Sequence, residues 1–243
     1  MKILSIGNSF SEDAHAYLHT LAKQRGIDLE TIDLAIGGCS LQMHYDNIVE
    51  NKARYLLGIN GGEWKDNYSV EQILKSDTFD VITLQQVSGY SGICDSYQPY
   101  LNEIIDYVRK FQPNAKLYLH RTWAYEIDST HGDFSKYDND QEKMFDAICK
   151  TTSKIAKETN LQIIPSGNTI QALRNKVKTF DYKNGGNSLC RDGFHLSNYG
   201  RYSVGLTWLK TFTNAPVSPM PFEDFDDDII AEICEIVNSD LLV

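Results

Sequence analysis

The sequence lacks a hydrophobic run long enough to cross a bilayer, which takes roughly 20 consecutive apolar residues. It also lacks a secretory signal peptide, because Lys2 is followed only by an apolar run of strand length and then by polar residues. These absences predict a cytoplasmic protein that does not enter a membrane. A periplasmic or secreted protein whose leader had been removed would show the same features.

Positive charge is scarce as well. The 243 residues include 23 Lys and Arg against 33 Asp and Glu, so the formal net charge is −10. A surface of this sign repels nucleic acid and anionic lipid, and neither is expected as a partner. A neutral small-molecule substrate fits this charge better.

Cysteines are few, and no two of them form a CxxC motif. Their odd number and uneven spacing argue against a disulfide framework or a zinc site. No pair of histidines has HExxH spacing, and the glycines at 58–62 lack the Lys and Ser or Thr of a phosphate-binding loop. The sequence therefore predicts no metal site. The five cysteines are Cys39, Cys94, Cys149, Cys190 and Cys234.

What the chain does contain is an alternation of short apolar runs with helical patterns. Strands are predicted at residues 3–6, 29–36, 79–84, 115–119 and 161–164, and a hairpin is expected around Asn60-Gly61-Gly62. Such alternation is typical of βαβ units and a parallel sheet. Helices are predicted over residues 11–25, 40–57, 70–74, 99–111, 140–158, 168–176, 198–212 and 226–238.

The expected fold is therefore an α/β three-layer sandwich of the flavodoxin-like type, with a central parallel sheet of about five strands. A length of 243 residues suffices for one domain with a sizeable core. The prolines near Pro216 lie too close to the end of the sequence to mark the boundary of a second domain. We expect one domain over residues 1–243.

Ser9 is the first candidate for chemistry. It follows the turn Gly7-Asn8 at the carboxyl end of the first predicted strand, and a helical pattern begins directly after it. Ligands bind at this edge of open α/β sheets, and a serine at a strand-to-helix turn exposes its hydroxyl. These features suit a nucleophile. The alternative is that Ser9 only caps the next helix, as Ser11 also could.

Asp192 and His195 are the second candidate, in the segment Cys190-Arg-Asp-Gly-Phe-His-Leu-Ser197 just before a predicted helix. A histidine at such a place can act as a general base toward a serine, and a carboxylate beside it fixes the tautomer and stabilises the imidazolium. The alternative is a carboxylate that caps the helix beside a histidine on the surface.

Taken together, these segments resemble the SGNH/GDSL hydrolase superfamily, whose members carry four short blocks in fixed order. Gly7-Asn8-Ser9 matches the first block with Asn in place of the usual Asp, and Asp192-Gly-Phe-His195 matches the last. Gly38, after the second predicted strand, matches the glycine that gives a backbone N–H to the oxyanion hole. The resemblance covers nearly the whole chain.

The third block departs from the pattern, because Gln85-Gln86-Val-Ser88 stands in place of GxND. A glutamine carries the same two N–H donors as asparagine on a longer stem. Adjacent strand residues point to opposite faces, so one of Gln85 and Gln86 is expected to face Ser9. Carbohydrate-esterase branches of the superfamily that look similar to this chain also have glutamine in this block. Alternatively, both glutamines are structural.

The resemblance implies ester hydrolysis without a metal or an organic cofactor. Ser9 would be the nucleophile, His195 the base and Asp192 its orienting carboxylate. The oxyanion hole would consist of the backbone N–H groups of Ser9 and Gly38 and of one glutamine amide, from Gln85 or Gln86. Two alternatives remain open, namely a non-catalytic carbohydrate-binding member of the same fold and an acyltransferase with the same catalytic residues.

The substrate is expected to be a small acyl ester, with an O-acetylated carbohydrate as the favoured class. His120, Trp123 and Tyr125 follow the fourth predicted strand and so belong to the same edge as Ser9. Their mixture of aromatic and polar groups would suit the face of a sugar, and we expect them to line the substrate site. Ordinary loop packing is the alternative.

Overall fold

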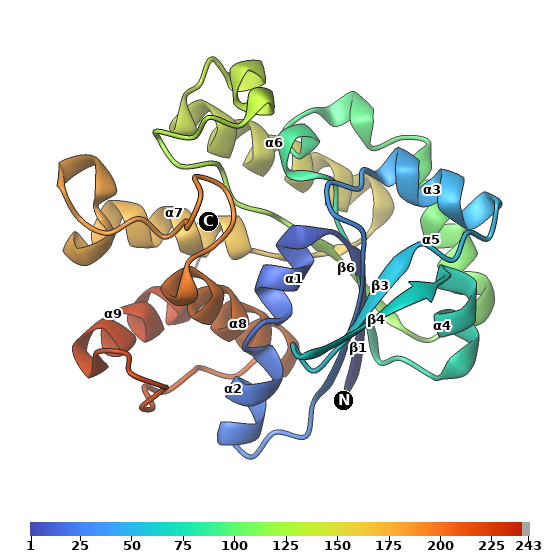
Figure 1. Ribbon diagram of the computed structural model, residues 1–243, viewed down its shortest axis with the longest axis horizontal. Helices are drawn as coiled ribbons and strands as arrows, with labels where there is room; N and C mark the ends of the chain where they lie inside the picture. Colours follow the sequence, from blue (N-terminus) through green and yellow to red (C-terminus); the bar gives the residue numbers. More distant parts are fainter. Residues whose placement is uncertain (240–243) are drawn as a thin grey trace.

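The centre of the protein is a seven-stranded sheet with the order β4-β3-β2-β1-β5-β6-β7 (Figure 1). The computed structural model describes residues 1–239. Five neighbouring strands are parallel, and β3 and β4 add an antiparallel hairpin at one edge. The strands are β1 (Lys2–Gly7), β2 (Glu30–Ala35), β3 (Tyr55–Ile59), β4 (Glu63–Tyr68), β5 (Val81–Leu84), β6 (Lys116–His120) and β7 (Gln162–Ile164).

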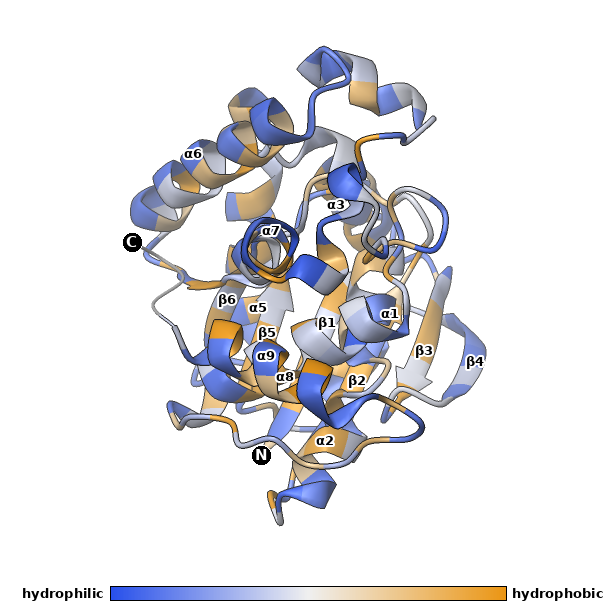
Figure 2. Cartoon of the chain, turned by 90° about the vertical axis from the view of Figure 1, so that its left-hand side faces the viewer, coloured by the Kyte–Doolittle hydropathy of each residue, from blue (hydrophilic) through white to orange (hydrophobic). Residues whose placement is uncertain are grey.

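Helices cover both faces of the sheet. One face packs against α1 (Ser9–His15), α2 (Leu18–Gln24), α7 (Ser166–Lys176), α8 (Asn198–Thr213) and α9 (Asp227–Asn238). The other packs against α3 (Leu41–Val49), α4 (Val70–Ser76) and α5 (Tyr100–Phe111). Helix α6 (Gln141–Thr159) contributes to the apolar core on both faces and mixes hydrophilic with hydrophobic residues (Figure 2). The expected α/β class with three layers is confirmed.

Strand β1 lies in the middle of the sheet and places the first candidate residue. It pairs in parallel with β2 on one side and β5 on the other. Its side chains alternate between the two cores, with Ile3 in one and Leu4 and Ile6 in the other. Because the carboxyl ends of parallel strands meet at one edge, the residues after β1, β2, β5 and β6 are brought together there.

The predicted helix over residues 40–57 is wrong in its second half. Helix α3 ends at Val49, and Asn51 has a positive φ of 47°, which breaks the helical path. Tyr55 and Leu57 are buried while Leu56 between them is exposed, the alternation of a strand. A short apolar run of this kind cannot be told from helix by its pattern alone.

The hairpin expected around Asn60-Gly61-Gly62 is confirmed, and it raises the strand count to seven. Asn60 and Gly61 have positive φ angles of 54° and 71°, as tight hairpin turns require. The turn packs against the end of α1, where the predicted helix over residues 11–25 divides into α1 and α2. Gly61 lies directly beside the carbonyl groups of His15 and Ala16 at this division.

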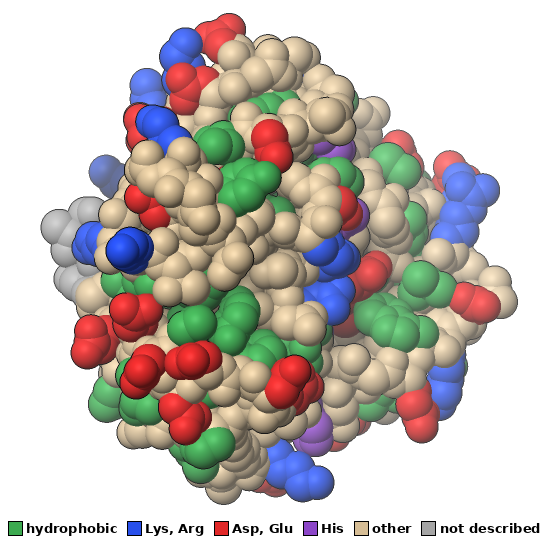
Figure 3. Space-filling model, turned by 60° about the vertical axis from the view of Figure 1, so that its left-hand side comes forward, with side chains coloured by type: hydrophobic (Ala, Val, Ile, Leu, Met, Phe, Trp, Pro, Cys, Tyr) green, Lys and Arg blue, Asp and Glu red, His purple; other side chains and the backbone are tan. Residues whose placement is uncertain are grey.

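The surface reflects the acidic composition. Figure 3 shows acidic side chains gathered at the lower left of the face that it draws, with few basic side chains among them. Of the helices within residues 1–239, none combines the length and the apolar character needed to cross a membrane.

Two glycines allow the role of close packing at the hairpin to be measured. Gly26 and Gly61 have nearly equal φ angles of 69° and 71°, but a Cβ at Gly26 would meet no atom within 4 Å, whereas one at Gly61 would lie 2.6 Å from the carbonyl oxygen of His15. We expect Gly26→Ala to lower the free energy of unfolding by about 1 kcal/mol through backbone strain alone. Gly61→Ala should lower it by about 2 kcal/mol more. Urea denaturation measures both, and equal losses would contradict the packing at Gly61.

Candidate active site

Ser9 stands at the point where β1 turns into α1. The strand ends at Gly7, and Asn8 caps the helix by accepting a hydrogen bond from the backbone N–H of Phe10 at 3.1 Å. Gly7 lets the turn fold closely, because a Cβ there would clash with the hydroxyl of Ser11. Ser9 is thus the first residue of α1, at the carboxyl edge of the sheet.

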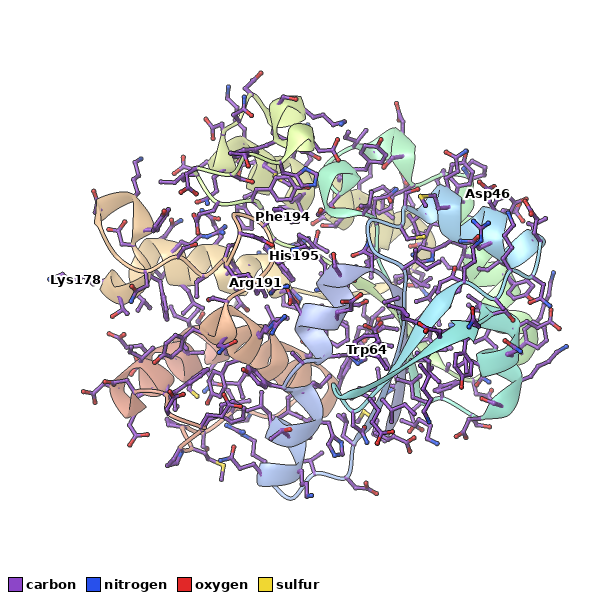
Figure 4. All side chains as sticks on the ribbon, viewed as in Figure 1. Asp46, Trp64, Lys178, Arg191, Phe194 and His195 are labelled. Atoms are coloured by element: carbon purple, nitrogen blue, oxygen red, sulfur yellow. The ribbon has the colours of Figure 1, made fainter. Side chains whose placement is uncertain are left out.

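The structure brings Ser9, His195 and Asp192 into one hydrogen-bonded row. His195 Nε2 lies 2.9 Å from Ser9 Oγ, and His195 Nδ1 lies 2.7 Å from Asp192 Oδ2. Because an ionised carboxylate can only accept, the proton belongs on Nδ1, and Nε2 is left to accept from the serine hydroxyl. Figure 4 shows His195 beside the start of α1, with Phe194 and Arg191 next to it.

Asp192 is held in its ionised form. Burial raises the pKa of this carboxyl, but hydrogen bonds from the His195 ring and from the backbone N–H groups of His195 and Phe194 outweigh burial, so the pKa lies below its ordinary value. The two backbone bonds measure 2.7 and 3.2 Å. They close the Asp192–His195 turn and fix the carboxylate against the ring.

A buried carboxylate on α1 fixes the loop that carries His195. Asp13 has no exposed surface. Its Oδ2 accepts from the backbone N–H of Leu196 at 2.7 Å, and its Oδ1 accepts from Arg191 at 2.9 Å and Arg201 at 2.8 Å. Leu196 is the neighbour of His195 in the chain, so Asp13 sets the distance between the loop and the helix that begins with Ser9.

Two further contacts hold the same loop from its other side. The indole N–H of Trp123 donates to the carbonyl oxygen of Phe194 at 2.7 Å. The backbone N–H of Glu126 donates to the carbonyl oxygen of Gly193 at 2.7 Å, where Gly193 has a φ of 88°. The loop is therefore tied to α1 and to the segment after β6.

Asp13, Arg191 and Arg201 were not predicted from the sequence. Asp13 follows Glu12 and looks like an ordinary acidic residue near a helix N-terminus. Nothing in the local pattern indicates its contact with Arg191, which lies 178 positions further along the chain. Only the tertiary structure identifies this group.

The two backbone amides predicted for the oxyanion hole have no hydrogen-bond partner in the described part of the chain. Neither the N–H of Ser9 nor that of Gly38 donates a hydrogen bond to any group within residues 1–239. Gly38 is exposed in the loop after β2 and has a φ of 66°, a conformation that favours glycine. Both amides are available to an incoming oxygen atom.

The structure distinguishes the two glutamines after β5. Gln86 is buried, and its Nε2 donates to the carbonyl oxygen and the hydroxyl of Ser96 at 2.9 and 3.1 Å, which engages its N–H groups. Its Oε1 accepts from the backbone N–H of Leu41 at 3.0 Å. Gln85 instead donates to Asn8 Oδ1 at 2.7 Å, directly beneath the turn that carries Ser9. Of the two, Gln85 is the one beside the candidate nucleophile.

The expectation that His120, Trp123 and Tyr125 line the substrate site is wrong. All three are buried, with exposed fractions of 2, 0 and 0 %. Trp123 stacks on Phe10 with ring centroids 4.3 Å apart, and the hydroxyl of Tyr125 lies 2.8 Å from that of Ser88. After β6 the chain packs against the core side of the loop that carries His195. These side chains therefore support the site from the core and do not line it.

The described part of the chain holds no group of three or more His, Cys, Asp or Glu side chains placed to bind a metal ion. All five cysteines lie in this part and are free thiols. The groups present at the site are a hydroxyl, an imidazole, a carboxylate and unpaired backbone amides. These are the groups that nucleophilic and acid–base catalysis employ.

Comparison with known proteins places the fold. The sequence matches the family described as "Domain of unknown function (DUF4886)" over residues 2–233. A DUF4886 family protein from Bacteroides uniformis, known from its crystal structure, is 34% identical with a TM-score of 0.90, over 98% of this chain and 93% of that one. No curated protein matches the sequence.

More distant structures share the fold. A proposed SGNH hydrolase from Slackia heliotrinireducens is 18% identical with a TM-score of 0.57, over 87% of this chain and 98% of that one. A catalytic mutant of an acetylxylan esterase from Geobacillus stearothermophilus is 12% identical with a TM-score of 0.57, over 86% and 92%. The fold is that of the SGNH/GDSL hydrolases, so the fold that the resemblance implied is confirmed.

Asp13 provides a test of how the site is held together. Asp13→Asn keeps an acceptor for Leu196 but removes the negative charge opposite Arg191 and Arg201. We expect urea denaturation to show a loss of roughly 3 kcal/mol in the free energy of unfolding. Asp138→Asn is the control, since the pair that it forms with Lys143 is exposed to solvent and contributes little to stability. A similar loss in both variants would show that the charge of Asp13 contributes no more to stability than a charge on the surface does.

Proposed function

The chain belongs to the DUF4886 family, and we propose that it is a serine esterase that hydrolyses small acyl esters with Ser9 as its nucleophile. One observation carries the proposal, namely the row of hydrogen bonds that joins Ser9 Oγ to His195 Nε2 at 2.9 Å and His195 Nδ1 to Asp192 at 2.7 Å. A nucleophile within hydrogen-bond reach of a base, which a third group orients, is the arrangement that activates a hydroxyl for attack.

In the proposed reaction, Ser9 Oγ attacks the carbonyl carbon of the ester while His195 Nε2 takes the hydroxyl proton. The carbonyl oxygen becomes an oxyanion, and Asp192 stabilises the imidazolium that forms. Collapse of the tetrahedral intermediate breaks the bond to the alcohol, which leaves with the proton from His195. A water molecule then gives a proton to His195 and attacks the acyl-serine carbonyl. The second tetrahedral intermediate collapses by breaking its bond to Ser9 Oγ, which takes the proton back from His195, and the carboxylic acid is released.

The unpaired amides of Ser9 and Gly38 are the proposed donors to the oxyanion. Preformed donors at this position stabilise charge that develops only in the transition state, so they raise kcat rather than substrate affinity. Gln85 is the favoured third donor because only one of its two N–H groups is engaged within residues 1–239, by Asn8 next to Ser9, whereas both N–H groups of Gln86 are engaged by Ser96.

An acetyl ester on a neutral carbohydrate is the proposed substrate class. The acidic composition favours an uncharged substrate over an anionic one, and one structure of similar fold is an acetylxylan esterase. His120, Trp123 and Tyr125 do not support a sugar substrate, since all three are buried. An acyltransferase would use the same residues and would differ in transferring the acyl group to an acceptor other than water.

Replacement of the nucleophile tests the activity directly. We expect the wild type to hydrolyse p-nitrophenyl acetate and Ser9→Ala to lose at least about 10³-fold in kcat/KM, because no other hydroxyl faces His195 Nε2 in the described structure. Ser135→Ala, which removes an exposed hydroxyl in the short helix Gly132–Tyr137, should leave the rate unchanged. Acetylated xylo-oligosaccharides serve as a second substrate, and equal activity of wild type and Ser9→Ala on both would refute the proposal.

Asp192→Asn tests the proposed role of the carboxylate. An amide at this position can donate to His195 Nδ1 and so favour the tautomer with its proton on Nε2, which cannot accept the proton of Ser9. We expect kcat to fall by roughly 10³–10⁴-fold with little change in KM. Asp46→Asn is the matched control, since Asp46 is an exposed residue of α3 that lies away from His195 (Figure 4). A fall of less than tenfold in Asp192→Asn would remove Asp192 from the proposed triad.

A further inference from the structure

A row of buried polar side chains runs beneath the candidate site and ends at the two loops that carry the free amides. His120 lies at its middle, with Nδ1 2.7 Å from Gln85 Oε1 and Nε2 2.9 Å from Ser166 Oγ. The exposed fraction of every member is at most 2 %. We call this row the buried network; its members are Asn8, Gln85, His120, Ser166 and Trp208.

At the Asn8 end of the buried network, the direction of each hydrogen bond follows from which atoms can donate and which can only accept. The amide of Asn8 donates to the carbonyl oxygen of Cys39 at 3.0 Å and accepts from the backbone N–H of Phe10, which fixes its orientation. Gln85 must therefore donate its Nε2 proton to Asn8 Oδ1, and its Oε1 is turned toward His120. Because Oε1 can only accept, His120 Nδ1 carries a proton.

At the Trp208 end of the buried network, the directions of the hydrogen bonds are fixed in the same way. Burial, with a smaller contribution from His15, lowers the pKa of His120 to about 3, so the ring is neutral and carries one proton. Its Nε2 therefore accepts from the hydroxyl of Ser166. The oxygen of Ser166 in turn accepts from the indole N–H of Trp208 at 3.0 Å, and an indole N–H can only donate. Each bond in the network has one permitted direction.

The two loops that meet at Asn8 are the two that bear the free amides. Asn8 precedes Ser9 in the turn between β1 and α1, and Cys39 follows Gly38 in the loop after β2. The side chain of Asn8 thus joins both loops, and Gln85 and His120 fix that side chain from below. None of these three groups lies on the row formed by Ser9, His195 and Asp192.

We propose that His120 is a positioning residue of the esterase, which acts through Gln85 and Asn8 to hold the amides of Ser9 and Gly38 at the spacing that the oxyanion requires. The expected effect of His120 on the reaction rate rests on the proposed function. Its effect on the position of the two loops does not depend on that function. A displacement of about 1 Å at a reacting centre lowers rates by about 10²-fold.

The network also accounts for the departures from the superfamily pattern. An aspartate at position 8 could accept from Gln85 but could not donate to the carbonyl oxygen of Cys39, whereas asparagine does both. Glutamine at position 85 reaches Asn8 with its amide nitrogen while its oxygen reaches His120. Asn8, Gln85 and His120 are therefore suited to one another as a set.

The test compares three variants. His120→Phe keeps a planar ring but removes both hydrogen bonds, His120→Asn supplies an N–H in the place of Nδ1, and Thr169→Val is the control. Thr169 is also buried on α7, three positions after Ser166, and its hydroxyl bonds to that of Thr207 on α8 at 2.7 Å, outside the network. All are assayed with p-nitrophenyl acetate, beside wild type and Ser9→Ala.

We expect His120→Phe to lower kcat by roughly 10- to 100-fold with KM within about twofold of the wild type. His120→Asn should recover most of the loss, and Thr169→Val should retain the wild-type kcat. Thermal unfolding of the variants separates a change of rate from a loss of folded protein. A kcat of His120→Phe no lower than that of Thr169→Val would overturn the inference.

Hydrogen exchange tests the structural claim without reference to activity. The backbone amides of Ser11 and Cys39 bond within the two loops, to the carbonyl oxygens of Asn8 and Ile36 at 2.8 and 3.1 Å. His120→Phe should exchange these amides faster, and Thr169→Val should exchange them as the wild type does. Unchanged exchange in His120→Phe would refute the inference. If His120→Phe exchanges these amides faster but Ser9→Ala is as active as the wild type, only the proposed esterase is refuted.

Discussion

The geometry of the site depends on the buried carboxylate of Asp13. A buried charge is tolerated only when charged and hydrogen-bonding partners replace the water that it has lost, and Arg191, Arg201 and the N–H of Leu196 do so here. These partners belong to the loop and helix around His195, while Asp13 belongs to the helix that begins with Ser9. Satisfying the carboxylate therefore brings two distant parts of the chain into one arrangement.

Features that depend on neighbours in the sequence could be predicted. The apolar run of β1, the turn after it and the Asp192–His195 spacing are local patterns, and the order of strands and helices confines Ser9 to the carboxyl edge of the sheet. The fold class and the hairpin at Asn60 follow from patterns of the same kind. Pattern and spacing were sufficient there because a few adjacent residues determine the backbone path.

Features that depend on the direction of a chain segment could not be predicted. The path after β6 decides whether His120, Trp123 and Tyr125 face a substrate or the core, and residue type does not fix that path. The segment at Tyr55 is too short for its apolar residues to distinguish strand from helix, and its pairing with β2 and β4 decides the matter. Asp13 is ordinary in its local sequence, and its importance arises entirely from partners far along the chain.

The position of β1 has a consequence for how the protein is made. Its two neighbours, β2 and β5, are complete by Leu84, so the centre of the sheet can form early as the chain leaves the ribosome. His195 is synthesised 186 residues after Ser9. For most of translation the turn that carries Ser9 therefore lacks its hydrogen-bonding partner, and the row that joins Ser9, His195 and Asp192 closes only when a late segment of the chain docks onto an early one.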